Sequence, residues 1–261
     1  MYLMCPPDYF RVDYSINPWM KGEEVNLENA KKQWSYLKSF LESLGADVKL
    51  IEPSQDYPDM VFTANAGIVH NKKVVLSNFK HKERQGEKKH FRAWFLENGY
   101  EVHELPEELL FEGRGDCFVY RNHLIGGYGQ RGSEESVLRA AEILELEPIT
   151  LELVDKRYYH LDTCLSIIDP RKGLAIYAES AFKKDIKEKM AAIDLNLMAV
   201  SAKECENFAC NSISFQSAVL LPKGSEKIER ELERHGHIPA PCDMSEFMKS
   251  GGACRCLVLE I

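Results

Sequence analysis

The chain has 261 residues, 44% of them hydrophobic, which is enough apolar material for one large domain or two small ones. Its formal net charge is −8, from 33 basic and 41 acidic residues, and no basic stripe is interleaved with aromatic residues. This composition argues against nucleic acid as a partner. Residue 1 is not followed by a basic region and a long apolar segment, and no run approaches the ~18 apolar residues of a membrane span. We therefore expect a cytoplasmic protein without membrane contact.

The predicted elements begin with a short strand at 2–4, which Pro6 and Pro7 end. Apolar residues at helical spacing then predict a helix over 25–44, and Gly45 stops it. Alternation predicts a strand over 46–51, and a hairpin of 61–69 with 74–76 follows. The order of this first round is therefore helix, strand, hairpin.

The same order recurs four more times. The sequence predicts helices over 83–98, 134–146, 181–193 and 225–235, strands over 100–105, 148–153, 196–200 and 237–244, and hairpins of 116–120 with 123–125, 163–168 with 174–177, and 213–215 with 218–221. In the fifth round, 256–261 lacks a partner strand, which residues 2–4 could supply.

A period near 48 residues indicates the architecture, because each such unit is too small to bury its own apolar face and must pack against its neighbours. Five units predict a five-fold pseudosymmetric α/β propeller, with the ring closed by the N- and C-terminal strands. A doubly wound sheet is the competing interpretation, but it does not require a hairpin before each helix. No G-x-G-x-x-G opens a helix either, and we interpret 126–129 as a loop.

Eight cysteines are present, at Cys5, Cys117, Cys164, Cys205, Cys210, Cys242, Cys254 and Cys256. We expect reduced thiols, most of them in the core, instead of a disulfide framework. A zinc site from the 254–256 and 205–210 pairs is an alternative, but neither pair has the usual C-x2-C spacing. We expect no metal and no cofactor.

Four polar residues recur with the period of the units. Asn65, Glu112, His160 and Cys256 are separated by 47, 48 and 96 residues, which is one or two periods each time. Equivalent points just before the hairpins of a five-unit ring would converge on its axis. Four such side chains would be costly to bury for structure alone, because an unpaired buried charge costs several kcal/mol. The spacing therefore predicts a site at the axis.

Each of these residues also has a structural interpretation. Glu112 could lie in a solvated turn, His160 in the core, and Asn65 at a turn that it caps, while Cys256 could be a small hydrophobic residue on a strand. Against this, glycines flank Glu112 and would let the backbone approach a ligand, and Asp116 adds a second carboxylate. Asp162, two residues after His160, could orient that histidine as a general acid/base.

A cysteine, a histidine and two carboxylates together favour nucleophilic attack on a cationic planar carbon. The carboxylates would hold a guanidinium through paired charge-assisted hydrogen bonds. Cys256 would attack as a thiolate, activated by the cation itself and by His160. His160 would protonate the departing nitrogen and then take a proton from water.

Over essentially its whole length the chain resembles the guanidine-modifying enzymes of the pentein fold, namely arginine deiminases, dimethylarginine dimethylaminohydrolases, arginine dihydrolases and amidinotransferases. The motifs are Asp59-Met-Val-Phe-Thr-Ala-Asn65-Ala-Gly67, Glu83-Arg-Gln-Gly-Glu87, Phe111-Glu-Gly-Arg-Gly-Asp116, His160-Leu-Asp162-Thr and Ser250-Gly-Gly-Ala-Cys-Arg-Cys256-Leu. The resemblance implies one catalytic domain over 1–261 and a hydrolase whose small-molecule substrate is arginine or a methylated arginine.

The resemblance also implies residue roles. Cys256 would form a covalent amidino (thiouronium) intermediate, His160 would act as acid/base, and Glu112 would anchor the guanidinium. The other implied substrate-binding residues are Asp116 or Asp162 beside Glu112, Arg84 and Arg131 for the substrate α-carboxylate, and Asn17 and Asp59 within the matching motifs. The alternative for the two arginines is a solvated face. Cys254 falls two residues early for the motif and is treated as a bystander.

One position departs from the deiminase pattern. Deiminases and dimethylarginine hydrolases usually carry an Asp where this chain has Asn65, and Asn17-Pro-Trp-Met20 resembles the arginine dihydrolase branch. An amide can accept from a guanidinium and also donate to a ureido carbonyl, so such an enzyme could hydrolyse citrulline again. We therefore expect conversion of arginine to ornithine, two ammonia and carbon dioxide.

Several alternatives stay open at this point. A dimethylarginine hydrolase or an arginine deiminase would stop at citrulline, and an amidinotransferase would use an amine in place of water. A non-catalytic binding protein of the translation anti-association factor type would share the five-unit ring without the Cys/His/carboxylate set. The oligomeric state is also open.

Overall fold

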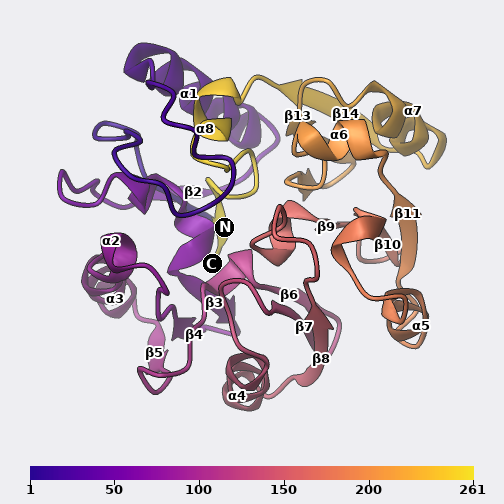
Figure 1. The fold of residues 1–261 in the computed structure, drawn as a ribbon, viewed down its shortest axis with the longest axis horizontal. Coiled ribbons are helices and arrows are strands. Elements are labelled where there is room, and N and C mark those ends of the chain that lie inside the picture. The colour runs from indigo at the N-terminus through magenta and orange to yellow at the C-terminus, as the bar shows by residue number, and fades with distance from the viewer.

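The computed structural model describes residues 1–261 and contains five three-stranded sheets arranged in a ring (Figure 1). In each sheet an antiparallel pair of strands, a hairpin in four of the five, is joined by a third strand that runs parallel to the middle one. The sheets are β3 (Gly67–His70), β4 (Lys73–Leu76) and β5 (Glu101–Glu104); β6 (Cys117–Tyr120), β7 (His123–Tyr128) and β8 (Glu147–Glu152); β9 (Leu165–Asp169), β10 (Leu174–Tyr177) and β11 (Asn196–Ala199); β12 (Ile213–Phe215), β13 (Ala218–Pro222) and β14 (Ile238–Cys242); and β15 (Leu259–Glu260), β1 (Tyr2–Met4) and β2 (Val48–Leu50).

The last sheet closes the ring with strands from the two ends of the chain. Tyr2 pairs with Glu260 and Leu3 with Leu259 in the antiparallel β1–β15 ladder, and β1 then pairs parallel with β2. Both ends lie near the middle of the ring in Figure 1. The five-fold pseudosymmetric α/β propeller and its closure by the terminal strands are therefore confirmed.

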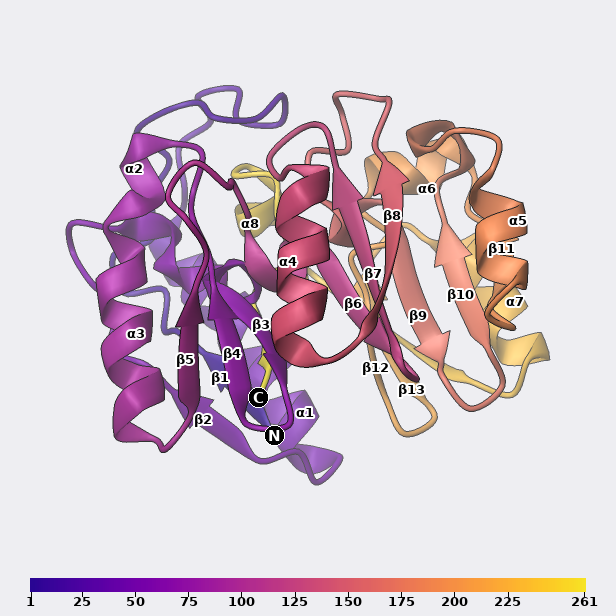
Figure 2. The ribbon, with the colours of Figure 1, turned by 90° about the horizontal axis from the view of Figure 1, so that it is seen from below.

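Helices lie on the outside of the ring. They are α1 (Leu27–Ser43), α2 (Lys82–Gln85), α3 (Glu87–Glu97), α4 (Glu134–Leu144), α5 (Ile186–Ala191), α6 (Ala202–Glu206), α7 (Glu226–Arg234) and α8 (Ser245–Met248). Figure 2 shows α3 beside the β3–β4–β5 sheet and α4 beside the β6–β7–β8 sheet. Local chemistry sets where they begin: the side chains of Asn26 and Ser133 accept hydrogen bonds from the first turns of α1 and α4. No helix combines the length and hydrophobicity that crossing a membrane requires.

The structure corrects three predicted elements. Residues 61–66 form parts of two short 3-10 helices, η1 (Pro58–Val61) and η2 (Thr63–Ala66), because the Thr63 hydroxyl bonds to the carbonyls of Leu3 and Leu257 and the Ala64 N–H bonds to the carbonyl of Cys256. The helix predicted over 83–98 divides at Gly86, where the Tyr57 ring occupies the place of a Cβ. Residues 126–128 belong to β7, not to a loop, since Val137 of α4 packs where Gly126 lacks a side chain.

The predicted helix over 181–193 is shorter than expected, and two short helices, α6 and α8, were not predicted. Both follow strands and have only four or five residues, which is too few for an apolar period to appear in the sequence. These differences do not change the order of the five units.

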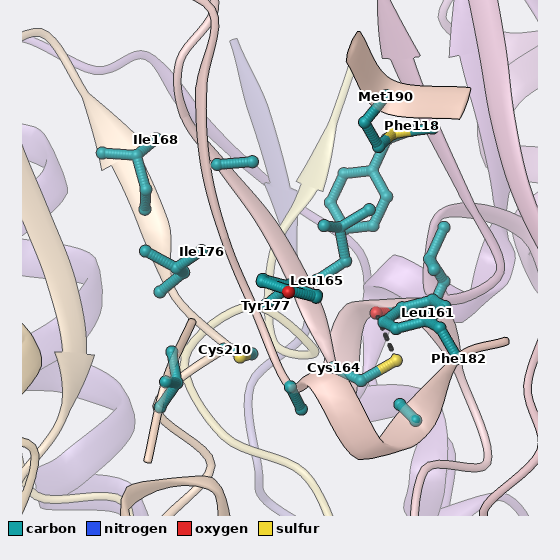
Figure 3. Close-up of a cluster of buried hydrophobic side chains, with 14 of the residues drawn as sticks. Phe118, Leu161, Cys164, Leu165, Ile168, Ile176, Tyr177, Phe182, Met190 and Cys210 are labelled. Atoms are coloured by element: carbon teal, nitrogen blue, oxygen red, sulfur yellow. Dashed lines mark hydrogen bonds between the residues drawn. The ribbon is translucent and has the colours of Figure 1, made fainter. Parts of the chain in front are cut away.

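The largest core cluster contains 29 buried residues and joins the sheets from β6 to β13. Figure 3 shows Phe118, Leu165 and Tyr177 among its side chains, together with Cys164 and Cys210. Residues 208–210 are at most 2% exposed and belong to this core or the adjoining cluster. The residue that follows them, Asn211, is therefore held by packed backbone.

Candidate active site

The four residues that share the period lie in the short turns that precede the hairpins. Asn65 is in η2, Glu112 and His160 come directly before the 3-10 helices η3 (Gly113–Gly115) and η4 (Leu161–Thr163), and Cys256 comes before β15. All four side chains are buried, with 0 to 2% exposure. Their turns meet at the axis: η2 contacts η3, and η3 contacts η4. A Cβ at Gly115 would collide with Asn65 and approach His160, so the glycine permits this convergence.

Glu112 joins His160 to Arg131. The Glu112 carboxylate lies 2.8 Å from His160 Nε2 and accepts from Arg131 at 2.9 and 3.2 Å. Burial alone would raise the pKa of Glu112, but the Arg131 guanidinium and the His160 hydrogen bond outweigh it and hold the pKa well below its usual range. Glu112 is therefore a carboxylate. Arg131 also donates to the Ile16 carbonyl and lies over the Tyr159 ring, so the solvated-face alternative for this arginine is wrong.

The partner of His160 differs from the one predicted. No hydrogen bond joins Asp162 to His160, and Glu112 is the carboxylate that orients the ring. The reason is geometric: η4 begins after His160, and Asp162 lies within it and faces Cys256. A proton on Nε2 then bonds to Glu112 and leaves His160 Nδ1 as the nitrogen directed toward Asn65, at 3.5 Å.

Asp116 lies behind Glu112 and has a different electrostatic environment. Its carboxylate accepts from the Glu112 N–H at 2.8 Å and approaches Gly132. Burial raises the pKa of Asp116 to about 7, opposed by His160 and reinforced by the charge of Glu112. Two neighbouring carboxyl groups thus have widely separated pKa values, as expected for a site that handles protons.

This raised pKa predicts a pH dependence of stability. The native protein holds the Asp116 proton to higher pH than the unfolded chain does, so this group makes the free energy of unfolding fall as pH rises from about 4 to about 7. In Asp116→Asn we expect the free energy of unfolding to fall less over this range, by roughly a few kcal/mol. Urea unfolding at pH 5 and at pH 8 measures this difference. Burial also raises the pKa of Glu87 to about 7, so Glu87 keeps part of the pH dependence of stability in the variant.

Asp194→Asn is the matched control, because that carboxylate is 82% exposed. It is expected to leave the slope unchanged. A slope in Asp116→Asn equal to that of the unmodified protein would contradict a buried neutral Asp116.

Asn65 has a fixed orientation. Arg84 donates to Asn65 Oδ1 at 2.8 Å, and an arginine has no acceptor, so the oxygen of this amide must face Arg84. Asn65 Nδ2 is left facing His160. The predicted dual role is therefore half supported: the amide can donate to a substrate, but its acceptor is already occupied in this structure.

Arg84 is buried, not solvated. It makes a two-point pair with Glu87 at 2.7 and 2.9 Å and donates to the Asp59 carbonyl at 3.1 Å. A substrate carboxylate at Arg84 would have to compete with Glu87, so the structure does not support the predicted role of Arg84 in binding that carboxylate. Arg84 instead orients Asn65.

Asn17 and Asp59 hold the N-terminal segment over the turn that carries the cysteine. Asn17 donates to the Ser250 carbonyl at 2.9 Å and lies against Gly251, whose φ of +87° and lack of a side chain permit the contact. Asp59 accepts from Tyr14 and from Ser250. These contacts hold the N-terminal segment against the turn from 250 to 256.

Cys256 has two side-chain partners. Its sulfur lies 3.4 Å from Asp162 Oδ2 and accepts from Asn211 Nδ2 at 3.1 Å. Burial, followed by the charge of Asp162, raises the pKa of the Cys256 thiol well above its ordinary value. No hydrogen bond joins it to His160, so of the two predicted activators the histidine is not in place. A cation beside Asp162 would lower the electrostatic cost of forming the thiolate. The Asp162 Oδ1 atom is buried without a hydrogen-bond partner, so it has a free acceptor for such a cation.

Asn211 was missed from the sequence. It lies 51 residues after His160 and 45 before Cys256, in the turn before β12, and so occupies the fourth position of the ring. The gap of 96 residues between His160 and Cys256 spans two periods, so a polar residue near its midpoint is the signal that points to Asn211. No group of three or more His, Cys, Asp or Glu side chains is placed to hold a metal ion.

Comparison with known proteins places this geometry in a family. The family model described as "N,N dimethylarginine dimethylhydrolase, eukaryotic" matches residues 8–261. The chain belongs to this family, one of the guanidine-modifying hydrolases of the pentein fold. A member from Mycobacterium tuberculosis, N(G),N(G)-dimethylarginine dimethylaminohydrolase, is 34% identical over 100% of the chain and 85% of its own length.

The family includes cyanobacterial relatives of greater similarity. The bifunctional arginine dihydrolase/ornithine cyclodeaminase AgrE of Nostoc sp. is 41% identical over 100% of the chain, which spans only 37% of that relative's length. A crystal structure of the N-terminal domain of ArgZ, an arginine dihydrolase, holds a covalently bound reaction intermediate in a mutant with serine in place of an asparagine. It superimposes with a TM-score of 0.93 at 40% identity, covering 99% of this chain and 96% of that one.

Proposed function

We propose that residues 1–261 form a single catalytic domain that hydrolyses arginine to ornithine, two ammonia and carbon dioxide. The observation that carries this proposal is the orientation of Asn65. Because Arg84 occupies its oxygen, the amide presents N–H groups beside His160. A guanidinium offers only donors, whereas the ureido group of citrulline offers a carbonyl acceptor. Asn65 is therefore suited to hold citrulline for a second hydrolysis, which is the step that separates a dihydrolase from a deiminase.

The first half of the reaction uses the charges around Cys256. The guanidinium of arginine would donate to the unpartnered Oδ1 of Asp162. The negative charge of Glu112, whose oxygens already accept from Arg131 and His160, would attract the guanidinium. Its positive charge would favour ionisation of the thiol, which burial and Asp162 otherwise oppose. The sulfur then bonds to the guanidinium carbon and one C–N bond breaks, while the proton lost by the thiol passes through His160 to the nitrogen that leaves as ammonia.

The second half restores the enzyme and repeats the chemistry. Water, deprotonated by His160, attacks the covalent carbon and breaks the C–S bond, which releases citrulline into the closed site. Asn65 would then donate to the ureido oxygen while Cys256 attacks again. Loss of the second ammonia, a second hydrolysis and decarboxylation give ornithine. Glu112 keeps the His160 ring oriented through both rounds.

The test is incubation of the purified protein separately with arginine, citrulline and dimethylarginine, with ammonia, citrulline and ornithine quantified over time. We expect ornithine from arginine, with close to two ammonia per ornithine. Citrulline as the only amino-acid product would reassign the domain to the deiminases. Absence of turnover with all three would favour a non-catalytic binding protein.

A second candidate is dimethylarginine hydrolysis, which is favoured by the family match and by the M. tuberculosis relative. Its signature would be citrulline and dimethylamine from dimethylarginine at a kcat/KM above that for arginine. An added amine acceptor that becomes amidinated would instead indicate an amidinotransferase.

We also propose a cytoplasmic setting and free arginine or a methylated arginine as the only partner required, with no nucleic acid and no membrane. The net charge of −8 supports the exclusion of nucleic acid. Light scattering at several concentrations would decide whether the domain forms a homo-oligomer.

A further inference from the structure

The Asn211 side chain organises the turn that carries Cys256. Its Oδ1 atom accepts hydrogen bonds from three backbone N–H groups, those of Ala253 at 3.1 Å, Arg255 at 3.0 Å and Cys256 at 3.2 Å. Asn211 is 0% exposed, so removing this oxygen would take a buried acceptor from all three N–H groups, of which that of Arg255 keeps a second partner, the Asn211 backbone carbonyl at 3.2 Å. One side chain thus supports the whole turn from 253 to 256.

These three bonds also fix which way the amide faces. Backbone N–H groups can only donate, so the atom that they share must be the oxygen, and the nitrogen must lie on the other side. Asn211 Nδ2 there donates to the Asp162 carbonyl and to Cys256 Sγ, both at 3.1 Å. The N–H therefore points at the sulfur by necessity.

The segment before Asn211 is packed in the core. Phe208, Ala209 and Cys210 are buried, and the Asn211 N–H donates to the Phe208 carbonyl at 2.8 Å. Cys210 lies within the packed cluster of Figure 3. The amide is consequently presented from the core of the fourth sheet to the nucleophile of the fifth.

We propose that Asn211 is the positioning residue of the nucleophile, which holds the 253–256 turn through its oxygen and favours the Cys256 thiolate through its N–H. An amide N–H directed at sulfur stabilises S⁻ more than S–H. Asp162, on the same sulfur, acts in the opposite direction. The Ala253 N–H acts on the sulfur in the same direction as Asn211, and a substrate cation at Asp162 shifts the balance between these donors and Asp162 toward attack. The inference rests on the proposed function only for its turnover readout.

The test is Asn211→Asp, which keeps an oxygen for the three backbone donors and replaces the N–H donor by a second carboxylate oxygen. We expect kcat to fall about 100-fold, as on loss of one preorganised donor, with a much smaller change in KM. The rising limb of the pH–rate profile is expected to move up by about one unit. Asn211→Ser removes the amide without adding a charge, and we expect it to change kcat and the pH–rate profile in the same direction. It replaces Asn211→Asp as the test if that variant fails to fold.

A second readout does not depend on turnover. The rate at which iodoacetamide and a haloacetamidine alkylate Cys256 at pH 8, followed by mass spectrometry of the intact protein and its peptides, should fall about tenfold in Asn211→Asp. Normal alkylation in an inactive unmodified protein would count against the proposed function, and slowed alkylation in the variant would still support Asn211.

Asn207→Ala is the matched control. Asn207 lies in the same segment and donates to the Gly224 carbonyl at 2.9 Å, far from the sulfur in the hydrogen-bond network. The Asn207→Ala variant should be less stable than the unmodified protein, with no change in the pH–rate profile or in the alkylation rate of Cys256. The inference is overturned if Asn211→Asp and Asn211→Ser keep the kcat, the pH profile and the alkylation rate of the unmodified protein, or if Asn207→Ala shifts them equally.

Discussion

Cys256→Ser is expected to lower turnover of arginine by at least about 10⁴-fold, the largest effect of any single substitution in this chain. Serine keeps the size of the side chain and its place beside Asn211 and Asp162, so the fold should be retained. It cannot form an anion in a buried site that already disfavours the cysteine thiolate. Ornithine, citrulline and ammonia release would be measured together with the unfolding midpoint.

Cys254→Ser provides the control two residues away. Cys254 is as buried as Cys256, but it belongs to the core cluster and lies beside Cys242. We expect some loss of stability and activity within a few-fold of the unmodified protein. Acid-quenched turnover should show a covalent mass increase on the unmodified protein and on Cys254→Ser, and none on Cys256→Ser. An active Cys256→Ser would remove the nucleophile from the mechanism.

The second large effect is a change of product. In Asn65→Asp we expect ornithine formation from arginine to fall about 100-fold, while citrulline accumulates. The carboxylate can accept from a guanidinium, so the first hydrolysis should continue, but it has no N–H for the ureido oxygen. An ionised carboxylate in this place would also pair with Arg84, which donates to the Asn65 oxygen at 2.8 Å. Time courses with arginine and with citrulline separate the two steps.

Asn71→Asp makes the same chemical change in the exposed β3–β4 turn, where φ is +49° and aspartate is tolerated. It should leave the product ratio unchanged. If Asn65→Asp produces ornithine as fast as the unmodified protein, the amide is not what retains citrulline, and the preference for a dihydrolase loses its support.

The ring was predictable because its determinants are local. Each unit repeats a helix pattern, an alternating strand and a hairpin, and apolar spacing reports all three. The pairing of residues 2–4 with the last strand followed from counting, since one hairpin lacked a partner, and the β1–β15 ladder confirms it. Short helices and the 3-10 turns were not predicted, because they depend on contacts with neighbouring sheets.

The site was predictable in its positions and less so in its contacts. Asn65, Glu112, His160 and Cys256 share the period, and their turns do converge on the axis. Which carboxylate pairs with His160 depends on how η3 and η4 orient the side chains beside them, and sequence spacing carries no such information. Asn211 was missed because asparagine in a loop is ordinarily a turn residue. Its role is visible only from the atoms around its amide.

The closure of the ring also bears on the stage of folding at which the Cys256 thiol becomes reactive. Cys256 lies three residues before β15, and the partner of β15 is β1, at the opposite end of the chain. Contacts of such long range are slow to form, because the whole intervening chain must first be brought together. We therefore expect the turn that carries Cys256 to become ordered late in folding, so that Cys256 acquires the partners that set its pKa only when the ring closes.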